Sequence, residues 1–318
     1  MDVMRCCRIY RAVRHHLRAP VLQSIIATMA EVFRQFDEDS VIIVGVGLIG
    51  GSIAAAIRQR HPGCRVTGVG RSEQRLAAAQ EAGLLNDWAT AVTASMLQGR
   101  SVVVVCLPVN MIAAQVRAIA PLASTDVLIT DAGSVKAAIC DRVMLDPKSA
   151  PLFVGAHPIA GGETGGFENA EADLFDGRVC VVTPPDHGEL DDRKIHRTEE
   201  FWSGIGCGVT RMTPREHDRI LALTSHLPHV MAAVTTSVVG TENLPLTGSG
   251  FRDATRIAAG SPALWKEILA GNREQVIAAV QSAEQMLADF RTALTEHNDP
   301  RIEELLSDAA VCRTSLES

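Results

Sequence analysis

Ionisable side chains follow two apolar segments in the middle of the chain. The first segment leads into residues 131–136 (DAGSVK), and the second leads into residues 155–163 (GAHPIAGGE). Ligands of open α/β sheets bind beyond the carboxyl ends of the strands, so both motifs are expected at one edge of a sheet. A neutral imidazole at such a place can accept a proton near neutral pH. The candidates for one reactive site are Ser134, Lys136, His157 and Glu163.

Each of these residues also has an ordinary structural interpretation when it is taken alone. Ser134 can cap the helix that follows it, and Lys136 can be a solvated amine. His157 stands before a proline, where a histidine is often a hydrogen-bonded turn residue. The four residues together are harder to explain in this way, so the sequence favours a shared site.

A second group of polar residues lies in the C-terminal third of the chain. His226 and His229 are three residues apart, which places them on one face of a helix. No third ligand follows at a metal-binding spacing, so we expect no metal site. Arg252 and Arg256 are candidates for a carboxylate receptor, or alternatively form an exposed, ion-paired face.

A glycine-rich turn precedes these groups in the chain. Residues 45–50 (GVGLIG) follow a β-branched strand and open a helical segment, which is the context that a dinucleotide-binding turn requires. The first glycine permits the tight turn, the second admits a pyrophosphate, and the third lets helix and strand pack closely. A turn without a ligand is the less favoured alternative, because each glycine costs chain entropy. The residues expected to hold a dinucleotide here are Gly45, Gly47, Leu48, Ile49 and Gly50, with Leu107 and Pro108 as further candidates.

The end of the second strand bears on which dinucleotide binds. An acid that would bind the adenosine ribose is missing from residues 69–72 (VGRS). Arg71 and Ser72 can instead receive a 2′-phosphate, so NADP is mildly favoured over NAD. The alternative, that Arg71 is a solvated surface arginine, has almost equal weight.

Short β-branched segments alternate with segments of helical period up to about residue 182, and this alternation is typical of a doubly wound parallel sheet. Beyond residue 213 the apolar spacing predicts helices alone, including one around 220–238 and one from the cap Asn272 to about residue 294. We therefore expect a Rossmann-type domain over 41–212 and an all-α domain over 213–318. The expected strands are 41–44, 65–69, 101–107, 127–130, 153–156, 179–183 and 208–212.

Composition narrows the class of protein. The 318 residues are 47% hydrophobic and 21% charged, with a net charge of −7 and few aromatic residues, which argues against nucleic acid as a partner. The apolar runs are too short to cross a bilayer. Eight cysteines without paired spacing are expected to be reduced, as in a cytoplasmic protein. Residues 1–40 form a basic extension that we expect to be poorly ordered.

Taken in order, these motifs resemble the prephenate/arogenate dehydrogenase family over about residues 41–295. The resemblance implies that His157 is the catalytic base, that Ser134 helps to hold it and that Arg256 binds a substrate carboxylate. It also implies that Glu163 and His229 shape the substrate pocket, with Trp265 near it, and that the helical domain forms a homodimer. The motifs that carry the resemblance are GVGLIGGS at 45–52, DAGSVK at 131–136, GAHPIAGGE at 155–163, LFDG at 174–177, SHLPH at 225–229 and GFRDATRIA at 250–258.

The reaction implied by this family is oxidative decarboxylation of a cyclohexadienyl acid with transfer of hydride to NAD or NADP. Such a small dicarboxylate needs a local cationic pocket in a chain of negative net charge, and Lys136, Arg252 and Arg256 are candidates for it, with His226 as a further substrate ligand. The sequence leaves prephenate and arogenate open. A β-hydroxyacid dehydrogenase and a non-catalytic dinucleotide sensor remain as alternatives.

Overall fold

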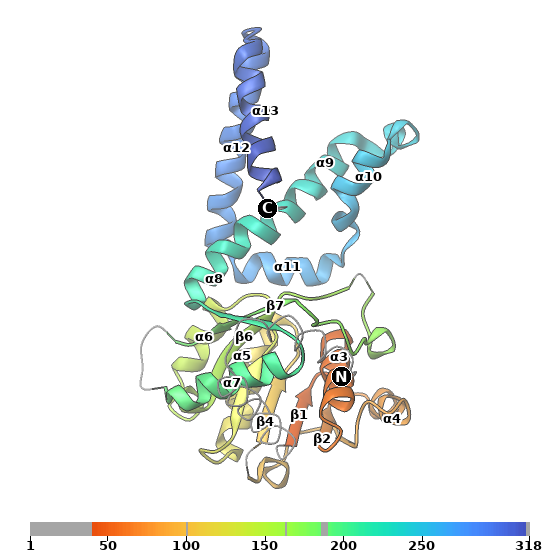
Figure 1. Ribbon diagram of the computed structural model, residues 1–318, viewed down its shortest axis with the longest axis vertical. Helices are drawn as coiled ribbons and strands as arrows, with labels where there is room; N and C mark the ends of the chain where they lie inside the picture. Colours follow the sequence, from red (N-terminus) through yellow and green to blue (C-terminus); the bar gives the residue numbers. More distant parts are fainter. Residues whose placement is uncertain (1–39, 100, 163, 186–189, 316–318) are drawn as a thin grey trace, which may run out of the picture. The chain divides into compact units, whose positions relative to one another are not determined.

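A computed structural model describes residues 40–99, 101–162, 164–185 and 190–315 (Figure 1). The basic extension predicted for residues 1–40 lies outside the described residues, apart from Ser40 in the first strand. The described chain divides into two compact units, one of residues 40–218 with Gly260–Gly271 and one of residues 219–259 with 272–315. The expected domain boundary after residue 212 lies just before helix α8, whereas the compact units divide inside that helix.

The first unit contains one sheet of eight strands, in the order β3-β2-β1-β4-β5-β6-β7-β8. All seven expected strands are present within a few residues of their predicted ends. The short strand β3 was not predicted, because three residues are too few to show an alternating pattern. The strands are β1 (Ser40–Val44), β2 (Arg65–Val69), β3 (Asp87–Ala89), β4 (Ser101–Val105), β5 (Leu128–Asp131), β6 (Phe153–Pro158), β7 (Val179–Thr183) and β8 (Gly208–Arg211).

One strand pair differs from the purely parallel sheet that the sequence predicted. Strands β6 and β7 pair antiparallel, with His157 opposite Val181, while the other neighbours are parallel. Parallel neighbours need a crossover connection, usually a helix. In the described residues between β6 and β7, the only helical element is the short 3-10 turn η4 (Phe167–Asn169), and the chain returns in the opposite direction.

Helices cover both faces of the sheet (Figure 1). Successive strand residues point to opposite faces, so Val41 and Ile43 join one apolar core while Ile42 and Val44 join the other. Strands buried on both faces are therefore apolar at nearly every position. The helices of this unit are α3 (Leu48–Arg60), α4 (Glu73–Glu81), α5 (Val109–Ile119), α6 (Ala137–Met144), α7 (Asp192–Gly204) and α11 (Pro262–Gly271), with 3-10 turns η1 (Ala94–Leu97), η2 (Ala120–Leu122) and η3 (Ala150–Leu152).

The second unit is helical, as predicted. Pro228 lies in the first turn of α9, directly after a π-helical turn, and the backbone leaves helical geometry farther on at Gly240 (φ 69°). The elements after β8 are α8 (Pro214–Leu221), η5 (Ala222–His226, the π turn), α9 (Leu227–Asn243), η6 (Leu244–Leu246), α10 (Ser249–Thr255), η7 (Arg256–Ala259), α12 (Arg273–Thr295) and α13 (Asp299–Thr314).

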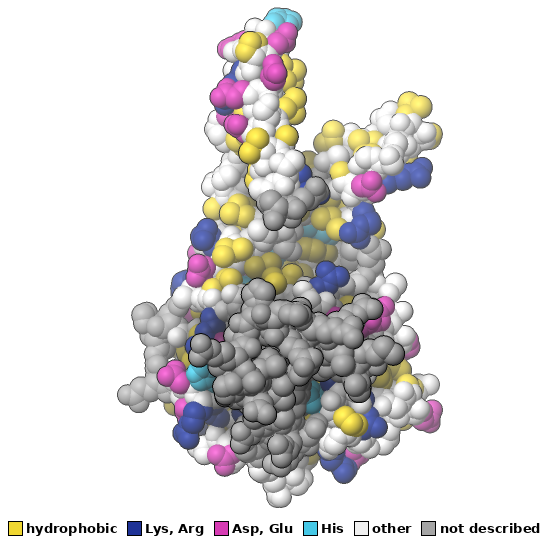
Figure 2. Space-filling view, viewed as in Figure 1, with side chains coloured by type: hydrophobic (Ala, Val, Ile, Leu, Met, Phe, Trp, Pro, Cys, Tyr) yellow, Lys and Arg dark blue, Asp and Glu magenta, His cyan; other side chains and the backbone are white. Residues whose placement is uncertain are grey.

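Large apolar side chains are exposed on the second unit. Figure 2 shows them along the α12–α13 pair and on the α9–α10 pair. A cluster of exposed apolar residues usually marks an interaction surface. The most exposed of them among the described residues of this unit are Val238, Leu246, Leu294, Leu306 and Val311. Within the described part of the chain, none of the helices has the length and apolar character needed to cross a membrane.

Candidate active site

The glycine-rich turn joins β1 to α3 at the carboxyl edge of the sheet. Gly45 has a φ of 99°, and a Cβ there would overlap the carbonyl oxygen of Cys106. A Cβ on Gly50 would overlap the carbonyl oxygen of Gly45. In contrast, a Cβ on Gly47 would meet no atom within 4 Å, because the backbone there borders open space. The turn therefore requires two of its glycines for its own geometry and uses the third to leave room for a ligand.

A cavity of about 710 Å³ opens beside this turn. Leu48 and Ile49 begin α3, and Pro108 is the N-cap of α5. Among the described residues that line the cavity there are two arginines and no acidic side chain. The space and the bare backbone at Gly47 fit an extended, phosphate-bearing ligand. The predicted cofactor residues that line the cavity are Gly45, Gly47, Arg71, Ser72 and Leu107.

The end of β2 supplies the polar part of the cavity. Arg71 is exposed, and Ser72 caps α4 by accepting a hydrogen bond from the backbone N–H of Arg75 at 3.4 Å. Arg75 also lines the cavity, forms an ion pair with Glu168 at 3.1 Å and lies over the Phe167 ring. Arg75 was not among the predicted residues, although its position three residues after the cap Ser72 places it on the first turn of α4, beside the cavity. The cation-rich cavity wall is thus larger than the sequence indicated.

Lys136 lies in a different place from the one predicted for it. Its side chain is fully buried, forms an ion pair with Asp131 and donates to the carbonyl oxygen of Ala156 at 2.8 Å. The Asp131 carboxylate also accepts from the backbone N–H groups of Gly133 at 2.9 Å and Ala156 at 3.1 Å. A buried amine needs such a partner, because an unpaired buried charge is very costly. Lys136 therefore clamps the ends of β5 and β6, and this corrects its assignment to a substrate carboxylate.

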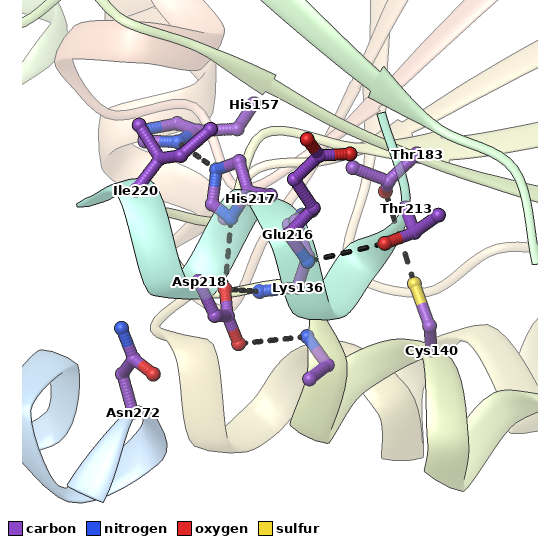
Figure 3. Close-up of polar contacts among 12 residues, drawn as sticks. Lys136, Cys140, His157, Thr183, Thr213, Glu216, His217, Asp218, Ile220 and Asn272 are labelled. Atoms are coloured by element: carbon purple, nitrogen blue, oxygen red, sulfur yellow. Dashed lines mark hydrogen bonds and ion pairs between the residues drawn. The ribbon is translucent and has the colours of Figure 1, made fainter. Parts of the chain in front are cut away.

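His157 is buried near the end of β6 and takes part in a chain of hydrogen bonds (Figure 3). Its Nδ1 lies 2.8 Å from Nε2 of His217, and the His217 Nδ1 lies 2.8 Å from Oδ1 of Asp218. Burial lowers the pKa of His217, although its hydrogen bond to Asp218 acts in the opposite direction. His217 and Asp218 were missed in the sequence because α8 showed only a helical pattern. The available signal was an adjacent His-Asp pair at the start of that helix.

Two further predicted residues flank His157 in the sequence. Ser134 is half-buried in the bend between β5 and α6. Glu163 lies outside the described residues. The ring contact described for His157 therefore comes from His217, and the role predicted for Ser134 in holding the ring stays a prediction.

The second unit carries the other predicted substrate ligands. His226 is buried, and its Nδ1 lies 3.2 Å from the amide nitrogen of Asn272. The Asn272 side chain thus contacts His226, whereas the sequence predicted that it would cap α12. His229 is also buried, which lowers its pKa, and Arg256 is exposed at the start of η7. Trp265 is half-buried on α11, which belongs to the first unit.

Two family models cover most of the chain. The nucleotide-binding domain of prephenate dehydrogenase matches residues 53–211, and the dimerization domain of prephenate dehydrogenase matches residues 213–308. The chain belongs to the prephenate dehydrogenase family. The first match is to a nucleotide-binding domain, and the glycine-rich turn at residues 45–50 lies just before it in the chain.

Known members of this family are similar along most of the chain. Prephenate dehydrogenase of Bacillus subtilis is 33% identical over 76% of this chain, and the match spans 66% of that protein, just under two thirds of its length. Cyclohexadienyl dehydrogenase of Zymomonas mobilis is 30% identical over 87% of this chain and 96% of that protein. Among solved structures, prephenate dehydrogenase of A. aeolicus in complex with hydroxyphenyl propionate and NAD+ has a TM-score of 0.80, with 27% identity over 87% of this chain and 98% of that one.

Proposed function

We propose that this protein oxidises prephenate, arogenate or both with NAD or NADP, releasing carbon dioxide and giving 4-hydroxyphenylpyruvate or tyrosine. The observation that carries the proposal is the buried His157 near the carboxyl end of β6, at the sheet edge that also bears the glycine-rich turn. The activities named for the Bacillus and Zymomonas relatives support it. The reaction belongs to the biosynthesis of tyrosine.

The dinucleotide would be held by the backbone of the glycine-rich turn and the N-terminus of α3, where N–H groups favour phosphate. When bound, this cofactor supplies the acceptor for the hydride. The groups proposed to contact it are Gly45, Gly47, Leu48, Ile49, Gly50, Arg71, Ser72, Leu107 and Pro108.

His157 would accept the proton of the ring hydroxyl while a hydride leaves the ring carbon that bears this hydroxyl. Ser134 would help to hold the imidazole or the hydroxyl in place. Loss of the ring carboxylate makes the ring aromatic, so the protein needs no acid to drive that step. Its task is to bind the dicarboxylate, exclude water and take one proton.

The helical unit would supply most groups that recognise the substrate. Arg256 would bind a carboxylate through charge-assisted hydrogen bonds, and His229 and His226 would shape the pocket. Glu163 and Trp265 belong to the same proposed pocket. Lys136 is left out, because its charge is buried against Asp131.

We also propose that NADP is used at least as well as NAD. Arg71 lines the cavity beside the end of β2, together with Arg75, whose charge is paired with Glu168, and no acid is among the described lining residues of the cavity. A cationic wall attracts the 2′-phosphate, and a carboxylate that would repel it is missing from that wall.

The proposed domain arrangement is a dinucleotide-binding domain over residues 41–212 and a helical dimerisation domain over 213–318. The family match to a dimerization domain and the exposed apolar residues of α12 and α13 support a homodimer. The molar mass of the protein particle in solution, measured by light scattering, tests for a dimer directly. A cytoplasmic location remains a prediction of the sequence.

The decisive experiment is a steady-state assay of prephenate and arogenate, each with NAD and with NADP, with the aromatic product identified by chromatography. We expect at least one acid to be oxidised with release of carbon dioxide. Turnover of open-chain β-hydroxy acids, with both cyclohexadienyl acids inert, would contradict the proposal. Binding of dinucleotide without turnover of any acid would point to a sensing protein.

A further inference from the structure

The side chains of His157, His217 and Asp218 form a chain of hydrogen bonds from strand β6 to helix α8 (Figure 3). Both steps are 2.8 Å long, which is a normal hydrogen-bond length. His217 is 0% exposed and Asp218 is 2% exposed. Neither residue was among those expected to do chemistry, and buried polar groups of this kind require an explanation.

The Asp218 carboxylate is the fixed end of this chain. Its Oδ1 accepts from the backbone N–H of Lys136 at 2.8 Å, and its Oδ2 accepts from the backbone N–H of Ala137 at 2.9 Å. Backbone N–H groups can only donate, so both oxygens act as acceptors. These N–H groups begin helix α6, whose dipole favours a negative charge at that end. With both oxygens held by donors in this way, Asp218 acts as an acceptor toward His217 as well.

Because Asp218 is an acceptor, it determines which ring nitrogen of His217, and then which ring nitrogen of His157, carries a proton. The Asp218 oxygen requires a proton on Nδ1 of His217, and the pKa of the buried His217 is lowered, so the ring is neutral with its Nε2 unprotonated. The unprotonated Nε2 in turn requires a donor, which must be Nδ1–H of His157. In the neutral His157 ring, Nε2 is then the basic nitrogen.

We propose that Asp218 and His217 are positioning residues that hold the His157 ring and place its proton on Nδ1, so that Nε2 is the atom that takes the substrate proton. This inference rests on the proposed function in so far as His157 acts as the base. Two residues of helix α8 that do not touch the reacting atoms would thus contribute to the rate of the reaction by positioning His157.

The proton balance of the step is simple. The O–H bond of the substrate hydroxyl breaks, and the proton forms an N–H bond with Nε2 of His157. Nδ1 keeps its proton, and the new positive charge on the ring lies one neutral imidazole away from the Asp218 carboxylate. A buried charge is stabilised by such a partner, since the low-dielectric interior strengthens the attraction. The arrangement follows the logic by which an aspartate orients a catalytic histidine in serine proteases, with an imidazole inserted between them.

The protonation order can be measured without any assay of activity. The full chain is labelled with ¹⁵N at histidine, and long-range ¹H–¹⁵N spectra at neutral pH distinguish protonated from unprotonated ring nitrogens. Spectra of His157→Ala and His217→Gln assign the two rings. We expect both rings to carry their proton on Nδ1. A His157 ring with its proton on Nε2 would overturn the proposal.

Kinetics of three variants test the consequence for the reaction. His217→Leu, which removes both hydrogen bonds, should lower kcat roughly 10²-fold while KM for substrate and dinucleotide changes less than about threefold. His217→Gln keeps a donor and an acceptor, so its kcat should be at least about tenfold higher than that of His217→Leu. Asp218→Asn should lower kcat and move the acid limb of the pH profile of kcat/KM to lower pH, because the protonated His157 loses a nearby negative charge.

The matched control is His196→Gln, which makes the same change in an exposed ring on α7 and should leave kcat unchanged. Melting temperature and dinucleotide affinity of every variant separate misfolding from loss of the relay. Full kcat in a folded His217→Leu would overturn the proposal, as would an unmoved acid limb in Asp218→Asn. If the wild type oxidises neither cyclohexadienyl acid, the proposed function fails, whereas the ¹⁵N spectra still decide whether the relay exists.

Discussion

At the scale of single residues, the candidate active site is organised by buried polar groups that have partners. The Lys136–Asp131 ion pair ties the ends of β5 and β6 together, and the His217 ring contacts His157 directly. Buried charges and rings with such partners lose little freedom on binding a substrate, since they are already held in one geometry. His157 is therefore held in place by its neighbours before any substrate binds.

Removal of the His157 imidazole should affect chemistry far more than binding. We expect His157→Ala to lower kcat by about 10²–10⁴-fold, which is the usual contribution of a positioned general base. The dissociation constant of the dinucleotide, measured by fluorescence titration, should change little. A rate within a few-fold of the wild type at the pH optimum would remove His157 from this role.

Arg256 should act on binding of the substrate. We expect Arg256→Ala to raise KM for the acid, because a charge-assisted hydrogen bond is worth roughly 1.5–3 kcal/mol. Arg256→Lys is the control, since it keeps the charge but not the two-pronged geometry, and should lie between the alanine variant and the wild type. Steady-state kinetics with saturating cofactor provide the measurement. An unchanged KM with a collapsed kcat would instead place Arg256 at the reacting centre.

At the scale of elements, the strand-to-helix turn after β1 and the end of β2 are the two places that we propose to select the nucleotide. The turn brings the backbone of Gly45 against the carbonyl group of Cys106, while Gly47 borders open space. At the end of β2, a Cβ on Gly70 would make only ordinary contact with Leu76, the nearest atom being at 3.6 Å. An added Cβ is therefore tolerated at Gly47 and Gly70 but not at Gly45.

Two alanine substitutions in the turn should separate folding from cofactor binding. Gly47→Ala places its Cβ in open space, so we expect an unchanged melting temperature and a weaker affinity for the dinucleotide. Gly50→Ala forces its Cβ against the carbonyl oxygen of Gly45, so we expect a lower melting temperature as well. Thermal unfolding and nucleotide titration of both variants test this. Equal melting temperatures for the two variants would show that the turn relaxes around either residue.

The choice of cofactor should depend on the end of β2. We expect the wild type to prefer NADP by around tenfold, about 1.4 kcal/mol, because the attraction of the exposed Arg71 is screened by solvent. Gly70→Asp has room for its Cβ and should move the preference toward NAD, by binding the ribose and repelling the 2′-phosphate. The measurement is kcat/KM for each cofactor at fixed ionic strength, with Arg71→Ala beside it. A strong wild-type preference for NAD, with Arg71→Ala indifferent, would show that Arg71 points away from the nucleotide.

At the scale of the whole molecule, the two compact units differ in how they bury apolar surface. The sheet unit buries its apolar side chains in two cores, one on each face of the sheet. The helical unit instead leaves large side chains such as Val238 and Val311 mostly exposed. A unit of this kind gains stability when a partner covers those side chains, so the stability of the protein should depend on its assembly.

The stability of the protein should decrease below about pH 6.5. Burial lowers the pKa of His217 and of His229 from an ordinary value of 6.5, so in this range the unfolded chain binds more protons than the folded chain. The free energy of unfolding therefore falls as the pH falls toward the lowered pKa values. Between about pH 7.5 and 5.5, we expect the free energy of unfolding to fall less in His217→Gln than in the wild type. Urea unfolding of both proteins at the two pH values provides the measurement. Equal losses would show that His217 does not titrate on unfolding.

The sequence by itself determined where seven of the eight strands lie along the chain, the glycine-rich turn, the helical C-terminal part and the family. These features depend on the type and period of neighbouring residues, which a linear pattern records. It also placed His157 at a strand end, because a short apolar segment leads directly into it. The short strand β3 and the antiparallel direction of β7 were not recoverable, since strand pairing depends on how the connection returns.

Only the tertiary structure decided the partners of the polar side chains. His157 and His217 are 60 residues apart, and they meet because β6 and α8 converge beside the start of α6. The same convergence buries Lys136 against Asp131, while Asn272 reaches His226 across the helical unit. The physical reason is that a buried polar group must find its hydrogen bond wherever the packing of the elements brings a partner, and that position is not written in any local pattern.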